Sequence, residues 1–130
     1  MKTAVLNQFM EENNIKALFM AVRWDEHPAR KDDKYFTKKE GGHLTPEHTR
    51  VAPILHFTER DIWDNIKLHS LPYCSLYEIG YRSLGVRTTS NPMEVGVPAW
   101  QQDLENTIER AGRRQDKEKA MGRLRKLGYM

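Results

Sequence analysis

The spacing of hydrophobic residues predicts a helix followed by a strand at the start of the chain. Between Thr3 and Asn13, four hydrophobic residues fall on one face of an amphipathic helix: Val5, Leu6, Phe9 and Met10. The next segment, Ile15–Val22, is short and almost uninterrupted in its hydrophobicity, which favours a strand covered on both faces, as in a parallel sheet. A helix that leads into such a strand is half of an α/β unit.

The middle of the chain predicts a long loop and a second helix. Residues 23–50 are polar and show no clear periodicity, and a loop of this length is usually functional or mobile. The segment Arg50–Phe57 turns hydrophobic again and is expected to be extended. Thr58 is suited to cap a helix that runs to about His69 before Pro72 stops it. The inward face of this helix is expected to carry Ile62, Trp63, Ile66 and His69.

Glycine and proline residues divide the remainder of the chain. Residues 73–98 hold three glycines and two prolines and are therefore predicted to be mostly loop. Two helices are expected after them, one with Trp100, Leu104, Ile108 and Ala111 on a face and one with Ala120, Leu124 and Leu127. We therefore expect an α/β fold for residues 1–98 and a basic helical tail for residues 99–130.

Composition limits the classes of function. The chain has 130 residues, of which 38% are hydrophobic and 30% charged, so it is large enough for one domain with a modest core. Its net charge of +3 is divided between a body of −3 (residues 1–109) and a tail of +6 (residues 110–130). This mild balance, and a tail without interleaved aromatic residues, argues against nucleic acid as a partner.

Targeting and cysteine usage point to a soluble, cytoplasmic protein without a membrane partner. No hydrophobic run approaches the roughly 18 residues of a membrane span, and the first residues do not resemble a signal peptide. The single cysteine, Cys74, excludes an internal disulfide or a four-cysteine cluster within one chain. Nothing near it in sequence would activate the thiol, so we expect a buried structural cysteine. The five histidines form no tight metal pattern, and no protein metal site is assigned.

The segment Arg23–Arg30 is the sharpest candidate for chemistry, because it follows the predicted strand directly. Ligands of open α/β sheets bind beyond the carboxyl ends of the strands, and two arginines there offer planar donors to phosphate or sulfate oxygens. Asp25 and Glu26 would orient those arginines or hold a magnesium ion. The alternative interpretation is a solvated charged loop with local ion pairs.

Two further segments are candidates for contacts to an anion. In Tyr77–Gly85 the glycines allow the backbone to approach a ligand, and Arg82 and Ser83 are suited to contact it. The alternative is a glycine-rich connector whose tyrosines pack on the core. In the tail, Arg113, Arg114 and Lys117 are candidates for a flap over the phosphates of a nucleotide, whereas a plain amphipathic docking helix is the simpler interpretation.

Three blocks together resemble a known family: Ala21–Arg30, Arg50–Trp63 and Pro72–Gly85. They are similar to the phosphoadenosine phosphosulfate reductase family, which includes reductases of adenylyl sulfate and phosphoadenylyl sulfate and the small subunit of bacterial sulfate adenylyltransferase. The resemblance covers about residues 15–128. It implies a partial adenine-nucleotide α-hydrolase-like (Rossmann-like) α/β domain with a helix-rich C-terminal part.

The chain also departs from the family pattern. The glycine- and serine-rich phosphate loop of the family has no counterpart in this sequence, so we expect a truncated piece, a split-gene product or a degenerate relative. Val86 and Thr89 stand where iron–sulfur reductases of the family carry cysteines, and the C-terminal catalytic cysteine is missing too. The resemblance therefore implies neither an iron–sulfur cluster nor thiol-dependent reduction.

The tail points instead to nucleotidyl transfer. Residues 110–129 are similar to the end of the sulfate adenylyltransferase small subunit, which implies that ATP and sulfate give adenylyl sulfate and pyrophosphate. By this resemblance Arg23 and Arg30 would bind the anionic substrate, Arg82 and Arg113 would close over it, and catalytic residues stay unassigned. ATP, adenylyl sulfate and Mg²⁺ are the expected ligands, with no cofactor bound by the chain alone.

Two alternatives remain open at this point. The first is a relative of the reductases without redox chemistry. The second is a non-catalytic half-domain that binds or assembles with a partner chain carrying the phosphate loop. A half-sheet has raw edges and an uncovered face, so we expect a homo-oligomer or such a partner.

Overall fold

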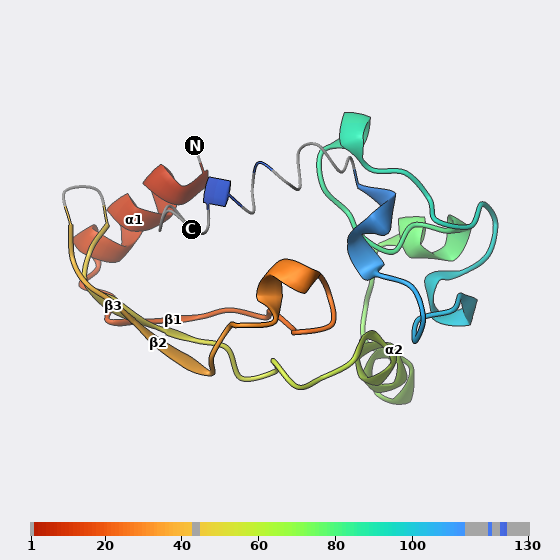
Figure 1. Cartoon of the computed structure of the whole chain (residues 1–130), viewed down its shortest axis with the longest axis horizontal. Helices are drawn as coiled ribbons and strands as arrows, with labels where there is room; N and C mark the ends of the chain where they lie inside the picture. The colour runs from red at the N-terminus through yellow and green to blue at the C-terminus, as the bar shows by residue number, and fades with distance from the viewer. Residues whose placement is uncertain (1, 43–44, 114–119, 121–122, 125–130) are drawn as a thin grey trace.

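The computed structural model describes residues 2–42, 45–113, 120, 123 and 124. Among these residues lie the α-helices α1 (Lys2–Glu12) and α2 (Glu59–Leu68) and the strands β1 (Ala17–Phe19), β2 (Phe36–Lys39) and β3 (His48–Val51). Five short 3₁₀ helices complete the described regular structure: Pro28–Arg30, Ser75–Ile79, Arg87–Thr89, Ala99–Gln101 and Glu109–Gly112. In Figure 1 the sheet and α1 occupy one end of the molecule, and α2 with the loop-rich segment of residues 69–113 occupies the other. The predicted α/β class is confirmed.

Strand β3 is the centre of the sheet. The strand order is β1-β3-β2, with β3 parallel to β1 and antiparallel to β2. The parallel pair continues past its formal ends, because the amide of Met20 donates to the carbonyl of Val51 (2.8 Å) and that of Trp24 to the carbonyl of Leu55 (3.0 Å). The carboxyl ends of β1 and β3 therefore lie side by side, which is the place where open α/β sheets bind ligands.

Two predictions about the sheet are wrong. Residues 23–50 are not one irregular loop, since they contain β2 and the first residues of β3. The first strand is not covered on both faces, because Phe19 is 71% exposed and Phe36, in the same row across the sheet, is 70% exposed. This row passes through Val51 on β3. Opposite it lies the face that carries Arg50 and its cross-strand neighbour Thr37.

Helix α2 is confirmed, and local sequence accounts for its start. Thr58 and Asp61 form a reciprocal capping box, and both of its hydrogen bonds are present. Trp63 is buried against Ala99 and Leu104 in one core cluster, whereas His69 is exposed, so its predicted inward position is wrong. Helix α1 is also confirmed. Of its four predicted inward residues, Met10 alone is buried, and the other three are exposed or partly exposed.

The first predicted C-terminal helix, residues 100–111, does not form. In its place stand two 3₁₀ turns, Ala99–Gln101 and Glu109–Gly112. The Gln102 side chain donates to the carbonyls of Gly80 (3.1 Å) and Val97 (2.8 Å), and Asp103 accepts from the Asn106 amide (3.2 Å). The Asp103 bond is a local side-chain bond of the kind that competes with helical ones, and the Gln102 bond to Gly80 ties the segment to a distant part of the chain. Of the second predicted helix, Ala120 and Leu124 are helical, and Leu127, like Arg114 and Lys117 of the predicted flap, lies outside the described residues.

Candidate functional site

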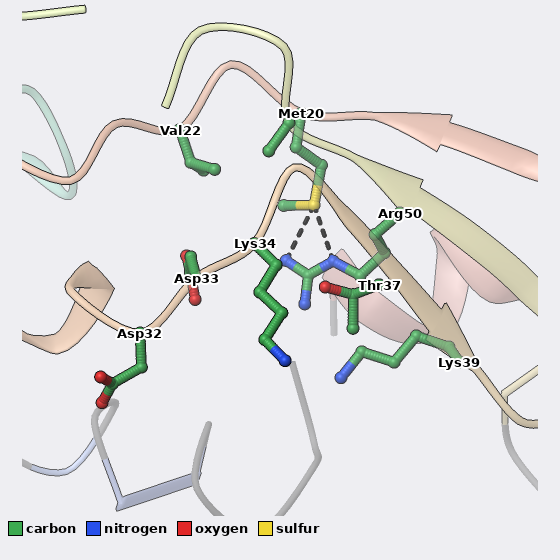
Figure 2. A pocket seen from close by; sticks show the side chains of 9 residues that line it. Met20, Val22, Asp32, Asp33, Lys34, Thr37, Lys39 and Arg50 are labelled. Carbon is green, nitrogen blue, oxygen red and sulfur yellow. Dashed lines mark hydrogen bonds between the residues drawn. The ribbon is translucent and has the colours of Figure 1, made fainter. Parts of the chain in front are cut away.

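A pocket opens at the carboxyl ends of the parallel pair, on the Arg50 face of the sheet. Its volume is about 300 Å³. The walls come from β2, β3 and the segments after β1 and before β2, and Figure 2 shows their side chains surrounding one space. The lining residues are Met20, Val22, Asp32, Asp33, Lys34, Thr37, Lys39, Arg50 and Ala52. The place matches the general rule for α/β sheets.

Arg50 is the central cation of this pocket. Its Nε and Nη2 atoms lie 3.0 and 2.8 Å from the Met20 sulfur, and no ion pair joins it to a carboxylate among the described residues. Burial lowers the pKa of Arg50, and the positive charge of Arg30 lowers it further, with Asp33 opposing. Figure 2 shows Lys34 and Lys39 extending into the same space. The pocket is therefore electropositive.

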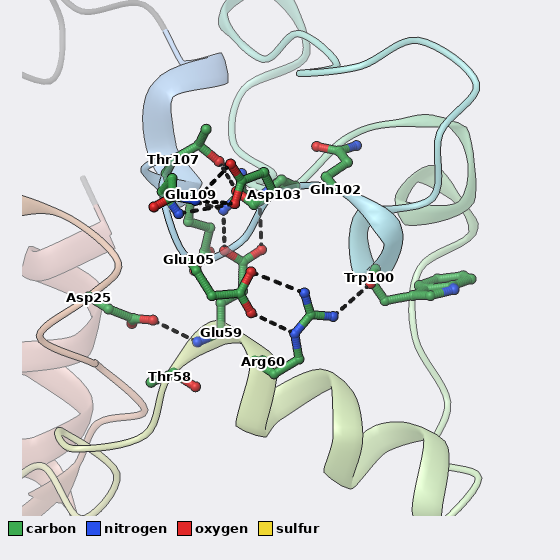
Figure 3. Close-up of polar contacts among 12 residues, drawn as sticks. Asp25, Thr58, Glu59, Arg60, Trp100, Gln102, Asp103, Glu105, Thr107 and Glu109 are labelled. Carbon is green, nitrogen blue, oxygen red and sulfur yellow. Dashed lines mark hydrogen bonds and ion pairs between the residues drawn. The ribbon is translucent and has the colours of Figure 1, made fainter.

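Arg23, predicted to bind an anion, is buried and held by two carboxylates. Its Nε donates to Asp25 (2.9 Å), and its Nη2 donates to Glu109. The second oxygen of Asp25 accepts from the Glu59 amide (2.6 Å), at the first turn of α2 (Figure 3). Burial raises the pKa of Glu109, and Arg23 offsets part of that increase. Arg23 thus ties the loop after β1 to the C-terminal half.

Arg30 and Glu26 form the next pair of the same loop. Arg30 is buried, and it donates to Glu26 (2.8 Å) and to Asp33 (3.1 Å). The contacts of Asp25 and Glu26 are those of residues that orient arginines. Arginines engage both carboxylates, and the described part of the chain holds no group of three His, Cys, Asp or Glu residues that would bind a metal ion. A magnesium ion held by Asp25 and Glu26 together with substrate phosphates stays a prediction. The predicted binding role of these four residues stays a prediction.

Arg82 and Arg113 lie in the C-terminal half. Arg82 is 3% exposed, and its guanidinium forms a two-point contact with Glu59, in which Nε lies 3.0 Å from Oε1. It also donates to the Thr107 hydroxyl and carbonyl. Arg113 donates to Ser83 Oγ (2.8 Å) and to the Leu84 carbonyl. Neither arginine lines the pocket around Arg50.

Sequence reasoning missed the three pocket cations. The one available signal was the spacing of Thr37 and Lys39, which are two residues apart and therefore lie on the same face of β2. Arg50 was assigned only to an extended segment, with no role in binding. Pairing of β2 with β3 is what gathers these side chains, and it is not visible in a polar segment. One smaller prediction is also wrong, because Cys74 is exposed and not buried.

No helix in the described part of the chain has the length and hydrophobicity that crossing a membrane would require.

The alternative prediction for Tyr77–Gly85, that its tyrosines pack on the core, holds for Tyr77. Its ring packs against that of Trp63, with the ring centroids 5.2 Å apart. Burial raises the pKa of the Tyr77 hydroxyl. This segment therefore joins the core cluster around Trp63 as well as holding Arg82.

Comparison with known proteins identifies both fold and family. The chain is 30% identical over 96 residues to phosphoadenosine 5'-phosphosulfate reductase of Xylella fastidiosa, which covers 74% of this chain and 38% of the relative. It is 31% identical over 83 residues to adenosine 5'-phosphosulfate reductase of Bacillus anthracis, covering 64% of this chain and 35% of the relative. The chain thus spans less than two fifths of these curated relatives.

A solved structure with the same fold is FMN adenylyltransferase of Candida glabrata, in complex with FMN and the ATP analogue AMPCPP. The TM-score is 0.71 at 20% identity, over 87% of this chain and 56% of that one. This likeness shows that the chain has part of the adenine-nucleotide α-hydrolase-like fold. The family model of the phosphoadenosine phosphosulfate reductase domain matches residues 1–92. Over the part of it that this sequence spans, the chain belongs to the phosphoadenosine phosphosulfate reductase family.

Proposed function

We propose that this chain binds an adenine nucleotide bearing a sulfate or phosphate group and serves adenylyl transfer, as the sulfate adenylyltransferase small subunit does. The observation that carries the proposal is the basic pocket at the carboxyl ends of β1 and β3. A ligand-binding position, three cations and membership of a sulfonucleotide family agree on one ligand class.

The comparisons support a nucleotide with an adenylyl group. The curated relatives are named as reductases of adenylylated sulfate compounds, and the solved structure is named as an adenylyltransferase. An adenylyl group is what these names share. Of the two reaction types, the resemblance favours adenylyl transfer over cluster-dependent reduction, because Val86 and Thr89 stand where iron–sulfur reductases of the family carry cysteines.

In the proposed reaction, a sulfate oxygen attacks the α-phosphorus of ATP, and the bond from that phosphorus to the bridging oxygen breaks. Adenylyl sulfate and pyrophosphate are the products, with no change of oxidation state. Such in-line displacement depends on positioning and charge neutralisation more than on covalent catalysis. The cations of this chain would supply part of that neutralisation. A further segment or partner chain would supply the phosphate loop, and association with such a partner or in a homo-oligomer is part of the proposal.

A second acceptor, FMN, is favoured by one observation. The solved structure with this fold is an enzyme named for adenylyl transfer to FMN. The chemistry at the α-phosphorus would be the same, with an FMN phosphate oxygen as the nucleophile. The choice between sulfate and FMN therefore concerns the acceptor and leaves the adenylyl donor unchanged.

Titration separates these functions. ATP, adenylyl sulfate, phosphoadenylyl sulfate and FMN are titrated against the chain by calorimetry, with adenosine as the uncharged reference. We expect the sulfonucleotides and ATP to bind more tightly than adenosine. Tight binding of FMN or FAD in place of adenylyl sulfate would move the assignment to the flavin acceptor. Failure of every adenine nucleotide to bind better than adenosine would refute the proposal.

The arginines predicted from sequence have their own test. Arg23→Ala and Arg30→Ala are titrated with the same nucleotides. Because both guanidiniums are held by carboxylates, a direct role requires that a ligand oxygen displace a carboxylate. Weaker nucleotide binding in folded variants would support the direct role, and parental affinity would assign these arginines to the framework.

A further inference from the structure

We propose that Arg50, Lys34 and Lys39 form a subsite for one tetrahedral oxyanion, a sulfate or a phosphate group. The subsite lies in the pocket at the carboxyl ends of β1 and β3, and none of the arginines expected from sequence to bind the substrate lines it. The identification of that oxyanion as part of a nucleotide rests on the proposed function. The affinity of the pocket for an oxyanion does not.

The N–H donors of Arg50 make only weak hydrogen bonds in this structure. Two of its nitrogens face the Met20 thioether, and a thioether sulfur is a weak acceptor. A guanidinium presents five N–H donors in a planar fork that matches the oxygens of phosphate or sulfate. An oxyanion is a far better acceptor than the sulfur, so it would take over these donors without breaking an ion pair. The Thr37 hydroxyl, opposite Arg50 across the sheet, lines the same pocket.

The charge around the pocket also favours an anion. Three cations line it, Lys34, Lys39 and Arg50, together with two carboxylates. One of those carboxylates, Asp33, accepts from Arg30 at 3.1 Å and is partly neutralised. Two cationic side chains that share a small space repel each other, and a dianion between them removes that repulsion. Arg30 adds a further positive charge, whose repulsion contributes to lowering the pKa of Arg50.

The buried arginines of the molecule provide the contrast. Arg23, Arg30 and Arg82 each have carboxylate partners, and a ligand would have to displace them. The volume of the pocket, about 300 Å³, lies at the lower end of the range of roughly 300–1,000 Å³ that is typical of ligand pockets. It therefore suits the oxyanion end of a nucleotide better than the whole molecule.

The test uses inorganic pyrophosphate, phosphate and sulfate as probes, titrated calorimetrically against the whole chain at constant ionic strength. Arg50→Met and Lys39→Met remove cations of the pocket. Lys38→Met is the matched control, because Lys38 neighbours Lys39 on the opposite face of β2, is 72% exposed at its side chain and is 3.5 Å from Glu47. We expect each pocket variant to weaken pyrophosphate binding at least tenfold, and the control to stay within twofold of the parent.

Arg50→Lys distinguishes loss of the planar guanidinium donors from unfolding of the protein. It keeps the charge, so we expect it to bind between the parent and Arg50→Met, with a parental circular dichroism spectrum. Parental affinity for all three oxyanions in both Arg50→Met and Lys39→Met would overturn the proposal. So would equal weakening by Lys38→Met, because it would indicate a diffuse surface effect.

The outcomes distinguish this subsite from the proposed function. If adenylyl sulfate binds tightly and Arg50→Met has no effect on it or on pyrophosphate, the subsite is refuted and the function stands. If Arg50→Met abolishes pyrophosphate binding while adenine nucleotides bind no better than pyrophosphate, the subsite stands and the function falls. Comparison of sulfate with phosphate then identifies which oxyanion the pocket prefers.

Discussion

Loss of one partner from the Arg82–Glu59 pair should destabilise the protein more than any other single change of charge in the described contacts. The two side chains are 1% and 6% exposed, and the guanidinium meets the carboxylate at two points. Arg82→Met leaves the Glu59 carboxylate buried without its counter-ion, and Glu59→Gln leaves the guanidinium in the same condition. Removing one partner of a buried ion pair typically costs about 3–5 kcal/mol.

The position of the pair raises the expected cost to the upper part of this range. Arg82 also donates to the hydroxyl and carbonyl of Thr107, so Arg82→Met removes more than one charged contact. The amide of Glu59 remains bound to Asp25 (2.6 Å) in either variant, so helix α2 itself should persist. Since small domains are stable by only about 5–15 kcal/mol, either variant should show a much lower urea midpoint.

Urea unfolding followed by tryptophan fluorescence, to which buried Trp63 contributes, provides the measurement. The control is Lys38→Met, which removes an ion pair whose side chains are 72% and 64% exposed and should change stability by less than about 1 kcal/mol. The double variant Arg82→Met with Glu59→Leu should recover part of the loss, because neither charge is then left alone. A free energy of unfolding for Arg82→Met within about 1 kcal/mol of the control would refute the reasoning.

Three further changes have defined outcomes. Gly80→Ala should lower the urea midpoint, because Gly80 has φ +110° and a Cβ there would overlap the Glu94 carbonyl. Strain at such a φ alone costs about 1–3 kcal/mol. The control Gly42→Ala should leave the midpoint unchanged, because a Cβ at Gly42 meets open space. Hydrogen bonds from Thr58 lower the pKa of Asp61. The Asp61 carboxylate therefore stabilises the protein above the usual pKa of an aspartate, and this stabilisation is lost as the pH falls through the lowered pKa of the folded state. Asp61→Asn should reduce the loss of stability at acid pH, measured as the free energy of unfolding against pH. Exposed Cys74 should react with a thiol reagent in the native state, and Cys74→Ser should leave nucleotide titrations unchanged.

Local signals in the sequence were enough for part of the fold. Helix α2 was predictable because its capping box and its stop are encoded within a few residues, around Thr58 and Pro72. Strand β2 was not predictable, because two lysines and a threonine fill three of its four positions and only pairing with β3 makes it a strand. The helix expected at residues 100–111 failed for a related reason, since Gln102 is held by carbonyls elsewhere in the chain.

The local part of the candidate site was predictable from sequence, and its long-range contacts were not. Sequence pointed to the segment Arg23–Arg30, and the structure does place it beside the carboxyl ends of the parallel strands. It could not indicate that Arg23 meets Glu109, 86 residues away, or that Arg82 meets Glu59. For Arg23 and Arg82, a carboxylate distant in sequence holds the arginine in the framework. Arg50 was missed because its importance comes from having no such ion pair within the described part of the chain.

The two kinds of arginine explain how a chain with little hydrophobic core can still shape a pocket. Apart from Met10, the buried hydrophobic residues of the described part of the chain fall into two small clusters, one around Leu55 and one around Trp63. Ion pairs such as Arg23–Glu109 bridge the segments that carry them. Buried ion pairs add little net stability, but each is satisfied in only one arrangement of its partners. The bridging pairs therefore fix the loop after β1 against α2 and the C-terminal half. With that loop fixed, the weakly committed donors of Arg50 are held in place before a ligand arrives, and a preorganised donor loses less entropy on binding.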